Sequence, residues 1–387
     1  MMNILFDFLP FQHAEGIGGH ASFTKRILDE LLLQNKPGIR WYATTDSTMQ
    51  KCKSFDVNGF CAANNITTVD LSKEKLCEVI QKHRIDVFFI SIGQLYSRYN
   101  LDNISCKTIM FIHDLFDIER YDNKIDAIIY DKNTDNRWKQ LKCYINLYSG
   151  RWKWQMTQCY HNIMQLYNSP QTIACTVSNY TRNSIKYYFQ YIEKDIKVYY
   201  SPLKYTETTD EIENVHLSAM ITSGKPYLLM IAANRRYKNP SVLMKVYRRI
   251  QKEFPDLHLV TLKYGKSIGA QHIDIPYLSD SDLEKAYEYA TALFFGSFFE
   301  GFGYPPIEAA KYGTPVIASN VTSIPEILGD AGVYFSPFYP ADLYRAIKSV
   351  LQNRDLRKEA IIKRYEDVCR RQQTDLQELI KQIFCSE

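Results

Sequence analysis

The sequence predicts an α/β protein built from two Rossmann-like, doubly wound domains. Short apolar runs that are typical of buried strands alternate with amphipathic stretches of helical period, which indicates βα units in a parallel sheet. The alternation lapses at residues 203–224, and the 387 residues exceed the usual length of one domain. We therefore expect an N-terminal domain at 1–202, a linker at 203–224 and a C-terminal domain at 225–387.

The first domain begins with a strand, a glycine-containing loop and a helix. Its expected strands are 3–9, 39–44, 85–93, 108–114, 171–178 and 196–202, and its expected helices are 23–33, 76–83 and 181–190. Residues 122–170 lose the strand pattern and predict a helical insertion. Its tryptophans and tyrosines, interleaved with Lys and Arg, suit a surface for lipid head groups or a glycan. A helical arm used for packing or oligomerisation is an equal alternative.

The second domain repeats the βα rhythm after a segment rich in Thr, Glu and Ser, which favours a linker. Its expected strands are 225–233, 257–263, 291–297, 315–319 and 333–337, with helices at 240–254, 282–290, 307–313 and 325–330. Amphipathic stretches fill 342–384, and the last helix is free to pack back on the N-terminal domain. Two such domains facing one another would place a ligand cleft between the carboxyl ends of both sheets.

Composition narrows the class of protein. Forty-seven Lys and Arg against 43 Asp and Glu give a net charge of +4, which argues against a dedicated nucleic-acid binder. Nine cysteines without a C-x-x-C pair indicate reduced thiols rather than disulfides or zinc ligands. The N-terminus resembles a first strand rather than a signal peptide, and no run is long and apolar enough for a membrane span. We expect a cytoplasmic protein.

Residues 298–319 contain the most informative loop of the chain. Glu300 and Glu308 lie eight positions apart, with two glycines and a double proline between them. Bare backbone N–H groups at a helix start can hold phosphate or sugar oxygens, while carboxylates accept hydrogen bonds from hydroxyls. By itself the pattern also fits an ordinary helix entry whose glutamate is stabilised by the helix dipole.

The wider segment, residues 278–337, closely resembles the donor-site half of retaining GT-B glycosyltransferases of the GT4 family. The matching elements are E-G-F-G-x-P-x-x-E-A, then G-T-P-V-I-A-S, then P-E-I-L-G-D-A-G. The resemblance implies a GT-B fold and metal-independent transfer of a sugar, with retained anomeric configuration. The implied donor is a GDP-mannose or UDP-sugar type nucleotide, and the implied acceptor is a hydroxyl of a glycan or lipid-linked molecule in cell-envelope polysaccharide or lipopolysaccharide synthesis.

The same resemblance assigns roles within the loop. Glu300 would contact the hydroxyls of the donor sugar, and Glu308 would bind the ribose diol. The amides of Phe302, Gly303 and Tyr304 would approach the sugar and the distal phosphate.

A basic cluster follows the first strand of the second domain. Arg235, Arg236 and Lys238 place three positive charges within four positions. Taken alone, they fit an exposed basic loop. The resemblance implies that Lys238 and one of the arginines, not specified by the sequence, neutralise the diphosphate leaving group, which itself helps to deprotonate the acceptor.

In the first domain, the resemblance implies that Gly18 and Gly19 admit the diphosphate and that His113 faces the donor sugar. Gly16, Gly18 and Ala21 also fit a G-x-G-x-x-A dinucleotide fingerprint, with Asp46 further along. This motif supplies an alternative, an NAD-dependent oxidoreductase, but it leaves the second-domain motifs unexplained. A catalytically silent GT-B binding subunit is a further alternative.

Two other motifs have simpler interpretations. Ser178 is expected to cap the helix that follows it. Asp280, Ser281 and Asp282 spell the D-x-D of metal-dependent glycosyltransferases, but Ser279–Asp282 fits a capping box. We therefore expect no metal or other cofactor. The expected partners are a nucleotide-sugar donor, a glycan or lipid-linked acceptor and a membrane surface bound peripherally at its inner face, with no nucleic acid.

Overall fold

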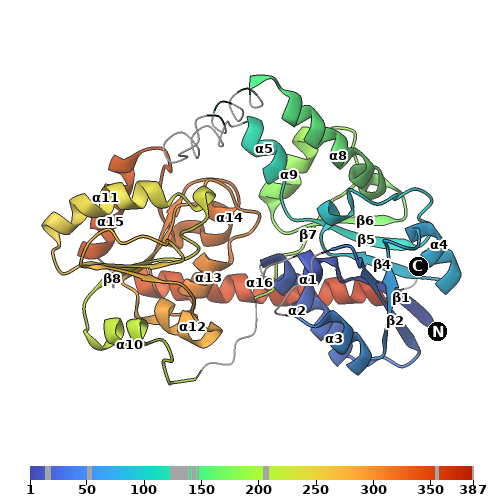
Figure 1. The fold of residues 1–387 in the computed structure, drawn as a ribbon, viewed down its shortest axis with the longest axis horizontal. Helices are drawn as coiled ribbons and strands as arrows, with labels where there is room; N and C mark the ends of the chain where they lie inside the picture. The colour runs from blue at the N-terminus through green and yellow to red at the C-terminus, as the bar shows by residue number, and fades with distance from the viewer. Residues whose placement is uncertain are drawn as a thin grey trace. The chain divides into compact units, whose positions relative to one another are not determined.

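The computed structural model describes residues 1–13, 19–49, 55–122, 148–203, 209–353 and 357–385, together with Trp138, Leu141 and Ile145 (Figure 1). The described residues form two compact units. The first contains the described residues up to 203 and those from Arg371 onward, and the second contains 209–353 and 357–370. Gly16, Gly18 and 22 of the 49 residues of the insertion predicted at 122–170 lie outside the described residues.

The first unit contains a seven-stranded parallel sheet of order β3-β2-β1-β4-β5-β6-β7. The strands are β1 (Met2–Asp7), β2 (Ile39–Thr45), β3 (Ile66–Asp70), β4 (Val87–Ile90), β5 (Lys107–Ile112), β6 (Thr172–Thr176) and β7 (Lys197–Val198). The strand order reverses between β1 and β4. In open parallel sheets this switch point is where ligands bind, outside the carboxyl ends of the strands.

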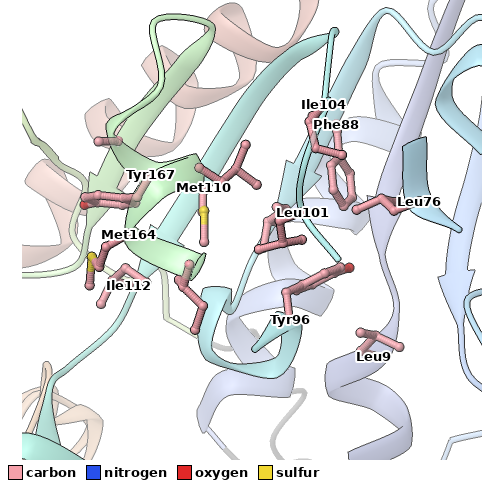
Figure 2. Close-up of a cluster of buried hydrophobic side chains, with 14 of the residues drawn as sticks. Leu9, Leu76, Phe88, Tyr96, Leu101, Ile104, Met110, Ile112, Met164 and Tyr167 are labelled. Carbon is pink, nitrogen blue, oxygen red and sulfur yellow. The ribbon is translucent and has the colours of Figure 1, made fainter. Parts of the chain in front are cut away.

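The helices of the first unit surround a core formed by several of these strands. They are α1 (Leu9–His13), α2 (Gly19–Leu33), α3 (Val57–Ala63), α4 (Leu76–His83), η1 (Gly93–Tyr96), α5 (Phe116–Asp122), α8 (Arg151–Asn168) and α9 (Asn179–Tyr188). Figure 2 shows Met164 and Tyr167 of α8 in the same cluster as Met110 of β5. The end of the predicted insertion is therefore part of the core.

The second unit contains a six-stranded parallel sheet of order β10-β9-β8-β11-β12-β13. The strands are β8 (Tyr227–Met230), β9 (His258–Leu262), β10 (His272–Ile275), β11 (Ala292–Phe295), β12 (Val316–Ser319) and β13 (Val333–Phe335). The order reverses between β8 and β11, so the loops that follow these two strands meet at the switch point.

Helices cover this second sheet. They are α10 (Val215–Thr222), η2 (Arg236–Lys238), α11 (Pro240–Glu253), α12 (Asp280–Tyr289), α13 (Tyr304–Ala310), α14 (Ile324–Leu328), η3 (Gly329–Ala331), α15 (Pro340–Gln352) and α16 (Lys358–Phe384). Helices α11 and α15 lie side by side (Figure 1). Their apolar residues, including Leu243 and Leu343, join Leu259 and Ile317 of the strands in one buried cluster.

Two observations bear on the expected boundaries. Helix α10 lies inside the segment 203–224 that we interpreted as a linker, capped by Asn214 and with Leu217 and Met220 buried. The end of α16 belongs to the first unit, where Gln372 Nε2 donates to the Ser201 carbonyl at 2.5 Å and Tyr200 N–H donates to Asp375 at 2.8 Å. Among the described residues, no helix is long and apolar enough to cross a membrane.

Candidate functional site

The loops at the switch point of the second sheet bring Lys238 and Glu300 together. Lys238 ends η2, which follows β8, and Glu300 lies in the loop after β11. The Lys238 ammonium and Glu300 Oε1 form an ion pair, and only 11% and 14% of the two side chains are exposed. Each charge compensates the other in a poorly hydrated place.

Several contacts hold Lys238 in this position. Its ammonium lies 4.5 Å from the centroid of the Phe295 ring and 5.3 Å from that of Tyr237, within cation–π range. The next residue, Asn239, has φ of 59° and donates through Nδ2 to the Pro337 carbonyl at 3.0 Å. These contacts fix both the backbone and the head group of the lysine.

Hydroxyl groups fix the loop that carries Glu300. Ser297 Oγ donates to Glu300 Oε1 at 2.6 Å, and Glu300 N–H donates to Thr322 Oγ1 at 3.1 Å. Ser323 Oγ contacts the carbonyls of Glu300 and Phe302 at 2.9 and 3.0 Å. Gly303 follows with φ of 101°, a conformation that side chains with Cβ disfavour. The loop after β12 thus braces the loop after β11.

Glu308 is held from α12. The fully buried Tyr287 hydroxyl donates to Glu308 Oε2 at 2.7 Å, and Thr314 Oγ1 donates to the Tyr287 carbonyl at 2.7 Å. Burial and the Glu308 charge hold the pKa of Tyr287 well above its usual value, so its hydroxyl remains a donor. Ser297 and Tyr287 therefore each orient one of the two glutamates.

The two arginines differ in their surroundings. Both are exposed, but Arg235 Nη1 donates to the Tyr237 hydroxyl at 3.0 Å. That hydrogen bond, with the negative charge of Glu300, raises the pKa of Arg235. The charge of Arg235 is therefore coupled to the Lys238–Glu300 pair.

In the first unit, His113 follows β5 and is buried. Its Nε2 lies 2.9 Å from the Ser91 carbonyl oxygen, and Thr181 Oγ1 donates to the His113 carbonyl oxygen at 3.0 Å. The ring packs edge-on against Phe23, with centroids 4.6 Å apart. Burial, and then the charge of His20, hold the pKa of His113 well below the ordinary value, so the imidazole is neutral. Gly19 is the first residue of α2.

Asp7, a residue that the sequence patterns did not single out, is fully buried at the end of β1. Burial raises its pKa to about 6, although hydrogen bonds from Ser91, Tyr96 and two backbone amides oppose the rise. The one available signal was a lone carboxylate in an apolar strand. Ser297, Ser323 and Tyr287 were also missed, because serines and tyrosines are common in loops and helices.

The structure shows the contacts of the two capping motifs, at Ser178 and at Ser279–Asp282. Ser178 caps α9 and Ser279 caps α12, which confirms both predicted N-caps, but the carboxylate half of the predicted capping box makes other contacts. The Asp282 carboxylate accepts the backbone N–H groups of Glu213 and Asn214 at 3.0 and 2.9 Å. No group of three or more potential metal ligands occurs among the described residues.

The Asp46 carboxylate, which the dinucleotide fingerprint requires for a ribose, is engaged within the protein. It accepts hydrogen bonds from Thr48 and Tyr99 at 2.5 Å each and pairs with Arg98 at 3.0 Å.

Comparison with known proteins places this site in a family. Residues 212–367 match the family described as "Glycosyl transferases group 1". Over 61 residues, 16% of this chain and 16% of the relative, the sequence is 49% identical to O-antigen chain mannosyltransferase B of Escherichia coli. It is 26% identical to O-antigen chain mannosyltransferase RfbU of Salmonella typhimurium over 188 residues, 46% of this chain and 50% of that protein. The matches therefore span half or less of these relatives' length.

The fold extends the similarity over the whole chain. The crystal structure of WaaG, "a glycosyltransferase involved in lipopolysaccharide biosynthesis", superposes with a TM-score of 0.60 at 13% identity, covering 99% of this chain and 100% of that one. The fold is GT-B, as predicted. Residues 212–367, the part of the chain that holds the loop motifs, match the group 1 glycosyl transferases, which agrees with the resemblance predicted from these motifs.

Proposed function

We propose that the protein is a retaining glycosyltransferase that moves a sugar from a nucleoside diphosphate donor to a hydroxyl of a glycan or lipid-linked acceptor in cell-envelope polysaccharide synthesis. The observation that carries the proposal is the buried Lys238–Glu300 pair at the switch point of the second sheet. This pair lies within residues 212–367, which match the glycosyl transferases group 1. Two relatives named as O-antigen mannosyltransferases favour a mannosyl donor such as GDP-mannose over a UDP-sugar.

Each residue has a role in this proposal. Departure of the diphosphate develops negative charge, which Lys238 stabilises as a preorganised cation, with Arg235 beside it. Arg235 is favoured over Arg236 because of its coupling to Tyr237 and Glu300. Positive charge from these residues supplies what a divalent cation supplies in other glycosyltransferases.

The glutamates bind the neutral parts of the donor. Ser297 and Lys238 both contact Oε1 of Glu300, which directs Oε2 toward the sugar hydroxyls. The Tyr287 hydroxyl donates to Oε2 of Glu308 and so helps to position the carboxylate proposed to bind the ribose diol. His113, neutral and buried, offers one ring nitrogen to a substrate hydroxyl. Gly18, Gly19 and the amides of Phe302, Gly303 and Tyr304 are the proposed backbone contacts of the diphosphate and sugar.

The proposal is tested with purified protein, GDP-mannose or UDP-glucose, and a lipid-linked glycan acceptor from an O-antigen pathway. We expect release of the nucleoside diphosphate together with a product whose anomeric proton coupling in NMR matches that of the donor. An inverted product would contradict retention. A nicotinamide absorbance change without any nucleotide release would contradict the activity itself.

A further inference from the structure

Asp7 is a buried carboxylate that the proposed reaction does not use. Its Oδ2 accepts hydrogen bonds from Ser91 N–H at 3.1 Å, Ser91 Oγ at 2.7 Å and Ile92 N–H at 3.3 Å. Its Oδ1 accepts from Leu9 N–H at 3.1 Å and from the Tyr96 hydroxyl at 2.9 Å. Five donors thus converge on one carboxylate at the switch point of the first sheet. Burying a charge is costly unless it is well hydrogen-bonded, as it is here.

Ser91 connects Asp7 to His113. Its backbone N–H and its hydroxyl both donate to Asp7, while its hydroxyl accepts from Thr24 Oγ1 at 2.8 Å. Its carbonyl oxygen lies 2.9 Å from His113 Nε2. A carbonyl oxygen can only accept, so Nε2 must carry the hydrogen. Because the imidazole is neutral, Nδ1 then carries the lone pair.

We propose that Asp7 is a positioning residue that acts through Ser91 to hold His113 in the Nε2–H tautomer, with Nδ1 as the acceptor for a substrate hydroxyl. The tautomer rests on the contact of His113 Nε2 with the Ser91 carbonyl and on the neutral state of the buried ring. The assignment of a substrate hydroxyl as the partner of His113 Nδ1 rests on the proposed function. Asp7 anchors both donors of Ser91, so removing its charge frees the Ser91 peptide to rotate and releases its carbonyl from Nε2.

Nitrogen NMR of the full-length protein with ¹⁵N-labelled histidine tests this proposal. Long-range ¹H–¹⁵N correlations distinguish protonated from unprotonated ring nitrogens, and the variant His113→Gln assigns the His113 signals. The wild type should show one tautomer, with Nδ1 at the unprotonated position. In Asp7→Asn both His113 nitrogens should shift toward the average of two exchanging tautomers. Asp70→Asn is the matched control, because Asp70 ends β3 and accepts from Ser47 and Ser72.

Measurement of kcat for the same variants provides a second test. Asp7→Asn should lower kcat about tenfold, as expected for coupled residues of one hydrogen-bond network, and this loss should vanish when His113 is already Gln. A purely structural role for Asp7 would lower kcat equally in both backgrounds.

The outcomes separate cleanly. A folded Asp7→Asn protein with an unchanged His113 tautomer would overturn the proposal. If Asp7→Asn does not fold, the wild-type spectrum still tests the tautomer, and an unprotonated Nε2 of His113 there would overturn the proposal. If the wild type shows no glycosyl transfer at all, the proposed function fails, but the NMR result still decides the role of Asp7.

Discussion

The ammonium of Lys238 and the carboxylate of Glu300 form an ion pair, and Ser297 donates to the same oxygen, Glu300 Oε1. Removing one partner of a mostly buried pair leaves the other charge uncompensated, at a cost of about 3 kcal/mol of unfolding free energy. Lys238→Met and Glu300→Gln should therefore each destabilise the protein, while the double variant should be more stable than the sum predicts. Urea unfolding of all four proteins checks this, and strictly additive effects would show that the pair does not form in solution.

Lys238 should also dominate catalysis. Loss of one preorganised donor to developing charge costs about 3 kcal/mol, so Lys238→Ala should lower kcat/KM by ~10² or more. Arg235→Ala should cost more than Arg236→Ala, since Arg235 Nη1 donates to the Tyr237 hydroxyl and the charge of Glu300 helps to raise the pKa of Arg235. Initial rates with a saturating acceptor measure these effects. If Arg236→Ala is the more damaging substitution, the phosphate clamp has been assigned to the wrong arginine.

Substitutions of the two glutamates should affect different kinetic constants. Glu308 is proposed to hold the ribose, which does not change during the reaction, so Glu308→Gln should mainly raise donor KM. Glu300 is proposed to touch the sugar, where charge develops, so Glu300→Gln should chiefly lower kcat. Saturation kinetics with one donor decide this, and a kcat loss confined to Glu308→Gln would show that the roles are reversed.

Removing the hydroxyls that orient these glutamates should change the same two kinetic constants, kcat and donor KM, by smaller amounts. Tyr287→Phe deletes only the donor to Glu308 and should raise donor KM, whereas Ser297→Ala deletes the donor to Glu300 and should lower kcat. Each loss should be about 1 kcal/mol, the usual net value of one hydrogen bond. Tyr264→Phe is a matched control in the same unit. Equal effects on both constants in both variants would argue for general loosening of the site.

Stability should depend on pH through Asp7. Its pKa is raised from 3.8 to about 6, so the folded state holds the proton more tightly than the unfolded state. The stabilisation is complete below about pH 4 and is lost as the pH rises through 6, a difference of about 3 kcal/mol at 1.36 kcal/mol per pKa unit. Urea unfolding from pH 4 to pH 7 should show this slope as a difference between wild type and Asp7→Asn. Parallel pH profiles for the two proteins would contradict the raised pKa.

Metal independence stays a prediction. With Lys238 and Arg235 in the cation's role and Asp282 engaged by backbone amides, turnover should survive excess chelator nearly unchanged. A large loss of turnover with chelator that Mg²⁺ or Mn²⁺ restores, in the wild type but not in Asp280→Asn, would contradict this account.

The interior strands could be predicted from their apolar runs, but two of the four edge strands could not. β3 and β10 were missed, and both are edge strands with several polar residues, for which the apolar pattern is weak. The strand expected at 196–202 ends at Val198, since the Tyr200 N–H donates to Asp375 instead. Such a partner, distant in sequence, cannot be read from a local pattern.

The site residues also fall into two groups, those that a local sequence motif indicates and those whose contacts form only in the folded chain. Glu300 and Glu308 stand in a local motif and Lys238 lies in a basic cluster after a strand, so the sequence alone could single out these three as candidates. Ser297, Tyr287 and Asp7 act through contacts that only the folded chain creates, and Asp7 reaches Ser91 across 84 residues of sequence. A buried carboxylate at a strand end is the one such feature that the sequence could have disclosed.

Isothermal titration of the full-length protein with GDP, UDP, ADP and dTDP, in the presence of chelator, tests the central claim most directly. We predict that at least one nucleoside diphosphate binds with 1:1 stoichiometry, and that Lys238→Met and Glu308→Gln each weaken its Kd about tenfold or more, equivalent to 1.4 kcal/mol. Lys348→Met, which breaks the more exposed pair with Glu253, should leave Kd unchanged. Absence of binding by all four nucleotides, or binding that neither site variant weakens, would contradict the account.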